Sequence, residues 1–293
     1  MSQTISAWFK ELIKDQVTVQ YQAHGGYLDG TMMSGDVQAN TVKFPIIGRT
    51  EVYELTGAIE KVPTGNVGLT TVQLTMRDFE ASEWWRVQDA YKAGPSEQAG
   101  LATILTKAIR RKRDAIKLDA LAAFAAAGGD VTTIGDGSGR IDLLHFEQAR
   151  AEIAGAAGDD DMIFAGIPAM WASQLAFYEE FGDARWVGED NAPFSKKQRS
   201  KMRTVRDITY IELPDEYFTG PASDELYAYV WAKSAIGAET PWNQEAADLT
   251  QHTDYQGSPW LAKTSISGAA VGIQGKGVKR LHMDKITAPA RPA

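Results

Sequence analysis

The side chains that most often carry enzyme chemistry are sparse in this chain and are not grouped as a site. The four histidines, His24, His145, His252 and His282, are scattered, and none stands at metal-ligand spacing from another histidine or from a carboxylate cluster. The sequence has 0 cysteines, which excludes disulfides, thiolate metal sites and cysteine nucleophiles. The G-x-S-x-G elbow of serine hydrolases is missing as well. We therefore predict no catalytic, cofactor-binding or metal-binding residue and no enzymatic activity.

Two short stretches could bind a charged ligand, but a simpler interpretation is favoured for each. Asp159, Asp160 and Asp161 could hold a cation, yet three adjacent side chains point in different directions, which favours a solvated turn. The stretch Gly135–Arg140, GDGSGR, has glycines like those of a phosphate loop. It lacks the Gly-Lys-Ser/Thr ending that such a loop needs, so a flexible loop is favoured.

Two clusters of positive charge remain as candidate binding surfaces. The first falls on a predicted helix and would spread around much of its circumference, so it is not one clean face for nucleic acid. Contact with acidic neighbours and solvent is favoured over contact with a phosphate backbone. The second cluster contains no acidic residue and has no clear apolar periodicity. The two clusters are Lys107, Arg110, Arg111, Lys112, Arg113 and Lys117, and Lys196, Lys197, Arg199, Lys201, Arg203 and Arg206.

Composition limits the class of protein. The chain has 293 residues, 44% of them hydrophobic, which is enough for about two domains with ordinary cores. The net charge of −8 argues against general nucleic-acid binding by the whole chain. No apolar run approaches the length of a membrane span, and the start, MSQTISAWFKELIKDQV, is polar where a signal peptide needs an apolar core. We expect a protein made in the cytoplasm, not exported and without membrane contact.

A long helix predicted over residues 95–127 is the element around which the others are organised. No glycine or proline interrupts it after Leu101, and Gly128-Gly129 ends it. At 1.5 Å per residue it would be roughly 45 Å long, which is more than a compact domain of this size needs. Apolar residues recur on it at helical spacing. They are Leu101, Leu105, Ala108, Ile109, Ile116, Leu121 and Phe124.

The residues before this helix are predicted to extend from the body of the protein. Residues 1–40 have too few apolar side chains to fold alone and are interpreted as an arm. Residues 41–77 alternate apolar and polar on two strands, which predicts a long β-hairpin. Because a two-stranded ribbon is marginal in water, we expect it to rest on another copy of the chain, with an edge hairpin of an intrachain sheet as the alternative. The residues predicted to make this intersubunit contact are Val42, Phe44, Ile46, Val72, Leu74 and Met76.

The remaining segments predict a short helix followed by a mixed α/β region. Residues 78–91, which include Trp84 and Trp85, have the pattern of an amphipathic helix, with the tryptophan pair as a core or interface anchor. Further helices are predicted over residues 142–157 and 168–181. Strands are predicted over residues 162–164, 208–213, 226–232, 263–273 and 278–283.

Several stretches, and the order in which they follow each other, carry a resemblance to a known family. They are TVKFPIIGR, TTVQLTMRDFEASEWW, KAIRRKRDAIKLDALAAFA and IDLLHFEQARAEI followed by MIFAGIPAMWASQL. Together they resemble the major capsid proteins of tailed bacteriophages, which have the Hong Kong 97 type fold. The resemblance covers nearly the whole chain and rests on arrangement rather than on a sharp motif.

This resemblance implies an α+β fold with a defined division of the chain. It implies an N-terminal arm, an extended β-hairpin loop, a peripheral domain with its spine helix, a mixed α/β axial domain, and a return to the peripheral domain that ends in a tail. The corresponding ranges are 1–40, 41–77, 78–140 with the spine at 95–127, 141–262 and 263–293.

The resemblance also implies a structural function. Such a protein self-assembles as pentamers and hexamers into an icosahedral shell that encloses double-stranded DNA, which it contacts without sequence specificity. It is made in the host bacterial cytoplasm and resides in the virion. Because Met1 begins almost directly at the arm, a separate scaffolding protein, or none, is implied in place of a removable scaffolding segment. Portal and decoration proteins are the other implied partners. Lys61 lies in the ribbon, but no crosslink partner is recognisable and no crosslink is predicted.

Two other functions stay open on the sequence alone. One is the shell of an encapsulin-type nanocompartment, which stores a cargo protein. The other is a soluble enzyme or carbohydrate-binding module that uses some of the 8 tryptophans. In the capsid interpretation, Lys197, Arg199 and Arg203 of the second cluster pair with acidic residues of adjacent subunits, such as Asp215 and Glu216, rather than with packaged DNA.

Overall fold

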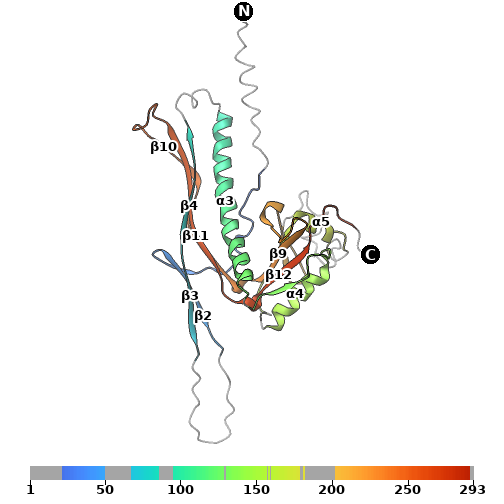
Figure 1. Ribbon diagram of the computed structural model, residues 1–293. Coiled ribbons are helices and arrows are strands. Elements are labelled where there is room, and N and C mark those ends of the chain that lie inside the picture. Colours follow the sequence, from blue (N-terminus) through green and yellow to red (C-terminus); the bar gives the residue numbers. More distant parts are fainter. Residues whose placement is uncertain are drawn as a thin grey trace, which may run out of the picture.

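The computed structural model describes residues 22–49, 67–85, 95–128, 130–156, 158, 160–178, 181 and 202–290. In these residues, three β-sheets surround one long helix (Figure 1). A long antiparallel sheet runs beside the helix, a narrow ribbon continues beyond that sheet, and a six-stranded sheet with its own helices lies on the other side. The described chain is therefore elongated, with a ribbon that projects from its body.

Helix α3 (Pro95–Ala126) confirms the predicted spine to within a residue at its end. Gly128 follows it with a φ of 71°, a left-handed conformation that glycine adopts without a Cβ clash. The predicted apolar stripe is only partly a core. Ile116 stays half-buried, and the members of the stripe that are buried are Leu105, Ile109 and Leu121.

The sheet beside α3 has the strand order β10-β11-β4, and all of its pairs are antiparallel. On β11, Thr264 and Ile266 are buried, whereas Ser265 between them is partly exposed. One face of the sheet therefore packs toward the helix and the other faces outward. The strands are β4 (Arg77–Trp85), β10 (Ile236–Gln251) and β11 (Trp260–Gly272).

The prediction of an amphipathic helix over residues 78–91 is wrong for the part that the structure describes. Residues 77–85 are strand β4, whose register on β11 runs from Arg77 opposite Gly268 to Trp85 opposite Trp260. Phe79 is half-buried and its neighbours Asp78 and Glu80 are exposed, as expected of a strand with one face turned toward the helix. This segment forms a strand because it pairs with the long edge of β11, which provides hydrogen-bond partners for the backbone of β4.

Strand β10 was not predicted at all. Its 16 residues include Pro241 and show no sustained alternation. The ladder to β11 is interrupted between Glu239 and Trp242 and again between Gln244 and Asp248. At each interruption, the alternation of side chains between the two faces of the sheet is shifted. The sequence therefore lacks the continuous two-residue period that predicts a strand.

The predicted hairpin is confirmed where the structure describes it. Strand β2 (Thr41–Ile47) pairs antiparallel with β3 (Leu69–Thr75), and the short β1 (Asp36–Gln38) pairs with the other edge of β2. Residues 50–66, which join β2 to β3, lie outside the described residues. The hairpin is thus the larger part of a small three-stranded sheet.

Val42 and Phe44 do not need another copy of the chain for their burial, contrary to the reasoning from the sequence. Both side chains are 0% exposed within the single chain. Phe44 lies against Gly237 of β10 and Gly35, so the base of the ribbon is fastened to the long sheet. Only glycine leaves room for the ring at these two positions.

Replacing Gly237 by alanine is expected to lower the free energy of unfolding by about 1–3 kcal/mol, the usual cost of overpacking a core. The added Cβ would fall inside the van der Waals envelope of the Phe44 ring. Gly139→Ala is the matched control, because Gly139 lies outside the helices and a Cβ there meets nothing within 4 Å. Urea unfolding of the two variants checks this, and equal midpoints would show that the ring moves away freely.

The six-stranded sheet has the order β5-β12-β9-β6-β8-β7. The predicted strands over residues 208–213 and 226–232 are confirmed, and so is the helix predicted over residues 142–157. The helix predicted over residues 168–181 is shorter, since the helix in the structure begins at Ala169 and ends at Leu175. The elements are β5 (Thr132–Ile134), α4 (Leu143–Gly155), β6 (Ile163–Pro168), α5 (Ala169–Leu175), β7 (Met202–Val205), β8 (Ile208–Leu213), β9 (Glu225–Ala232) and β12 (Val278–Asp284), with single 3-10 turns at Asp215–Tyr217, Lys233–Ala235 and Gly275–Gly277.

The sheets group the chain differently from the ranges implied by the resemblance. Strand β10 falls in the range 141–262 but belongs to the sheet beside α3, together with β4 and β11. Strand β12 falls in the range 263–293 but lies inside the six-stranded sheet, between β5 and β9. The chain crosses from one sheet to the other near Ala235, whose carbonyl accepts the amide of Ile273. Strand order along the sequence could not reveal this crossing.

Candidate assembly surfaces

Much of the first positive cluster is neutralised inside the chain. Arg110 and Arg113 bind Glu245 of β10, with nitrogen-to-oxygen distances of 2.7 and 3.2 Å. Arg113 and Lys117 bind Asp29, at 2.6 and 2.8 Å. The favoured interpretation, contact with acidic neighbours, is confirmed for these three cations. These charges are therefore not available as a surface for DNA.

Asp114, on the same face of α3, fastens the segment that precedes the ribbon. Its side chain is 0% exposed, and its two oxygens accept the backbone N–H groups of Tyr27 and Leu28 at 3.1 and 3.2 Å. Burial raises the pKa of Asp114, while these two hydrogen bonds and Lys117 act against the rise. Part of the predicted arm thus packs on the spine, and sequence reasoning missed it because the partners are far apart in the chain.

Each of the four histidines has a local structural partner. His24 contacts Arg110, and His145 completes the N-terminal cap of α4. His252 packs edge-on against Trp84, and His282 Nε2 lies 2.7 Å from a carboxylate oxygen of Glu225. Among the described residues, no three His, Asp or Glu side chains are gathered as ligands for a metal ion. In the same residues, no helix is both long and apolar enough to cross a bilayer.

The ribbon exposes apolar side chains along its length. Ile46, Val72, Leu74 and Met76, all predicted contact residues, are half-buried. At the end of the paired strands, Ile47 lies opposite Leu69, and the two side chains are 73% and 78% exposed. Large apolar side chains that face each other in solvent are typical of a surface that a partner covers.

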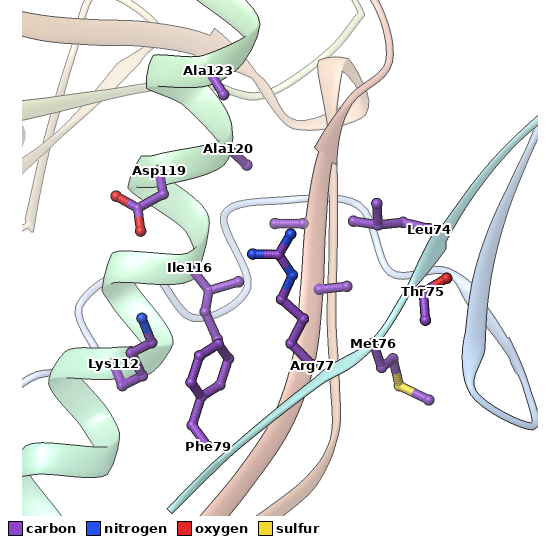
Figure 2. A pocket seen from close by; sticks show the side chains of 13 residues that line it. Leu74, Thr75, Met76, Arg77, Phe79, Lys112, Ile116, Asp119, Ala120 and Ala123 are labelled. Carbon is purple, nitrogen blue, oxygen red and sulfur yellow. The ribbon is translucent and has the colours of Figure 1, made fainter.

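A groove of about 610 Å³ separates the base of the ribbon from the spine helix (Figure 2). Leu74 and Met76 line one side, and residues 268–270 of β11 line it as well. Figure 2 shows Arg77 extending from β4 toward the helix. Lys112 lies 4.3 Å from the centre of the Phe79 ring, and the helix side of the groove is completed by Ile116, Asp119, Ala120 and Ala123.

The far end of the long sheet carries an exposed aromatic cluster. The ring centre of Trp84 lies 5.2 Å from that of His252 and 5.3 Å from that of Tyr255. Trp84 and Tyr255 are both more than half exposed, so Trp84 is not a core residue. Aromatic side chains are enriched where proteins bind each other, which leaves the interface part of the prediction for this tryptophan open.

The structure describes only part of the second positive cluster. Lys197 and Arg199 lie outside the described residues, and Arg203 is half-buried on β7 opposite Tyr210. Of the acidic residues named as their partners, Asp215 accepts the backbone N–H of Ala169, at the start of α5, at 3.2 Å. An oxygen of that carboxylate thus already has a structural contact.

Comparison with known proteins gives the family. The model of the phage capsid protein family matches residues 5–165, more than half of the chain. No curated protein matches the sequence.

Solved capsids have the same architecture at low sequence identity. The capsid of Ralstonia phage GP4 has a TM-score of 0.69 and 9% identity, over 99% of this chain and 100% of that one. The capsid of the cyanophage P-SCSP1u has a TM-score of 0.62 and 10% identity, over 92% and 91%. The chain from Mycobacterium phage Che8 has a TM-score of 0.61 and 12% sequence identity, over 91% of this chain and 94% of that one. The chain therefore belongs to the phage capsid protein family, has the α+β fold of the Hong Kong 97 type, and is a structural, non-enzymatic protein of the virion.

Proposed function

We propose that this chain is the major capsid protein of a tailed bacteriophage, and that pentamers and hexamers of it close into an icosahedral shell around double-stranded DNA. The observation that carries the proposal is an elongated subunit of the capsid family whose ribbon and groove leave apolar side chains uncovered. Such a surface is costly in a free monomer and is covered when neighbours pack on it. Scaffolding, portal and decoration proteins are separate chains in this proposal.

The sheets suggest how the subunit is divided. Helix α3 and the β10-β11-β4 sheet form the peripheral domain, and the six-stranded sheet with α4 and α5 forms the axial domain around the symmetry axes of the capsomers. The ribbon of β2 and β3 is the extended loop. Under this division β10 is peripheral and β12 is axial, which revises the ranges expected from the sequence.

The ribbon of one subunit is proposed to lie in the groove of a neighbour. The exposed pair of Ile47 and Leu69 brings apolar surface to the ribbon end, and the groove offers Ile116 and small side chains. The charge of the groove also fits an acidic partner, because its two cations, Arg77 and Lys112, outnumber its one carboxylate, Asp119. Charge complementarity of this kind fixes register and suppresses wrong partners. The acidic residues of the stretch that joins the two strands are Glu51, Glu54 and Glu60.

The second positive cluster gives the experiment that tests capsomer formation. Replacing Lys197, Arg199 and Arg203 by glutamine is expected to weaken capsomers in the absence of DNA, because like charges that meet around a symmetry axis need acidic partners from adjacent subunits. Sedimentation of the purified variant at several salt concentrations measures this. Assembly of the unmodified chain should also weaken as screening shortens to about 10 Å and below.

The opposite result would change the assignment of this cluster. If the triple variant forms empty shells at the normal yield but packages DNA poorly, the cluster faces the DNA and does not pair across the subunit interface. Nuclease-protected DNA in particles recovered from the host further separates a phage head from an encapsulin-type compartment, which would hold a cargo protein.

A further inference from the structure

The last described residues of the chain form a strap across helix α5. After β12 ends, the carbonyl of Asp284 accepts the indole N–H of Trp171 at 3.2 Å. Ile286 is 4% exposed and belongs to the same core cluster as Trp171. Lys285 and residues 287–290 are exposed. One apolar side chain and a few hydrogen bonds therefore hold a segment that otherwise faces solvent.

Gln174 holds the far end of this strap by its backbone. Its side-chain Nε2 donates to the carbonyl of Ala290, and its Oε1 accepts the N–H of Ala290, both at 2.7 Å. The glutamine itself is only 4% exposed. A primary amide that pairs with both backbone groups of one residue copies the hydrogen bonds of a neighbouring β-strand. This contact recognises an extended backbone and not a particular side chain.

We propose that Trp171 and Gln174 form a peptide-binding site, that the chain's own residues 284–290 occupy it, and that it accepts the same segment from a second copy when its own is displaced. The site has the parts needed to bind a peptide through its backbone. Gln174 binds the backbone at one end, the indole N–H of Trp171 donates at the other, and the Ile286 side chain is buried between them. The intramolecular strap is favoured over a free peptide by its high effective concentration.

A binding experiment on the full chain tests this proposal. The probe is a fluorescent peptide with the sequence of residues 284–293, DKITAPARPA. In full-length Ile286→Asp protein, the altered strap should leave the site because a buried charge is unfavourable. The peptide is expected to bind this variant at least about tenfold more tightly than the unmodified chain, whose own strap competes. The measurement is made on unassembled protein, so that it does not depend on shell formation.

Substitutions on α5 test whether Gln174 binds the peptide backbone. In the Ile286→Asp background, Gln174→Ala should weaken peptide binding at least about tenfold, since both hydrogen bonds from the buried glutamine to the Ala290 backbone are lost. Gln174→Glu loses the donor and places a buried carboxylate against the Ala290 carbonyl, so it should weaken peptide binding at least as much as alanine does. Ser173→Ala is the matched control, because that hydroxyl only donates to the Ala169 carbonyl of its own helix.

Two outcomes would overturn the proposal. One is peptide binding to the Ile286→Asp chain that is no tighter than to the unmodified chain. The other is binding that Gln174→Ala leaves unchanged, which would place the peptide elsewhere. If Ile286→Asp does not fold, Ile286→Ala takes its place, because it loosens the strap by removing buried apolar surface without introducing a charge. The same two comparisons are then made with that variant, and the same two outcomes would overturn the proposal.

Discussion

Replacing Asp114 by alanine is expected to lower the free energy of unfolding by about 2–4 kcal/mol. The buried carboxylate accepts the N–H groups of Tyr27 and Leu28, and alanine would leave both donors without an acceptor, at about 1–3 kcal/mol each. The variant also loses the negative charge beside the buried Lys117. Burial raises the pKa of Asp114, which shows that the carboxylate carries a desolvation penalty. Because alanine removes this penalty, the net loss of stability is smaller than the full cost of two unsatisfied N–H donors.

Asp119 supplies the matched control for this prediction. It lies on the same helix and is exposed, so Asp119→Ala gains the same helix propensity but should change the unfolding free energy by no more than about 0.5 kcal/mol. Asp114→Asn keeps one acceptor oxygen and should fall between the two alanine variants. Urea unfolding of the unassembled proteins gives the values. If Asp114→Ala and Asp119→Ala unfold at the same midpoint, the segment around Leu28 is not held by this carboxylate.

Replacing Ala123 by tryptophan is expected to abolish closed particles while leaving the subunit folded. Ala123 is exposed and lines the groove of Figure 2, so an indole there fills the space proposed for the neighbour's ribbon without disturbing the core. Ala122→Trp is the control, because Ala122 is equally exposed on the next position of the helix but does not line the groove. Deleting residues 51–66 should also prevent closed particles, since it removes the acidic residues proposed to complement Arg77 and Lys112.

Gradient sedimentation and electron microscopy of the three variants measure this effect. Particles from Ala123→Trp at the unmodified yield would show that the groove is not an assembly surface. Failure of both tryptophan variants would instead point to a general role of that end of α3. Circular dichroism of the soluble fractions checks that the subunits are folded in every case.

The elements that the sequence could predict are those whose pattern is local. For helix α3, the helical period, the absence of glycine and proline after Leu101, and the terminating glycine all lie within one stretch of sequence. Strands β8 and β9 are short apolar runs. Strand β4 depends on the edge of β11, and β10 carries interruptions that hide its period. Because strand pairing joins residues far apart in the chain, the choice between helix and strand at residues 78–85 could not be made from that stretch alone.

The candidate surfaces follow the same rule. The alternation of the ribbon gave its contact residues, but the sequence could not say that Val42 and Phe44 are covered by the chain itself. The contacts of Asp114 and the pairing of Arg113 with Glu245 were missed, because the sequence of a charged helix does not show which distant residues it contacts. One signal was present: Arg110, Arg113, Asp114 and Lys117 recur at a spacing of three or four residues, which places them on one face.

Electron microscopy of the purified, unmodified chain shows whether it assembles into a shell. We expect closed particles of uniform size, built from rings of five and six subunits, which sediment far ahead of a 32.0 kDa monomer. A preparation that contains only monomers or small oligomers, under low-salt conditions and at high protein concentration, would contradict the claim that this chain builds the capsid shell by itself.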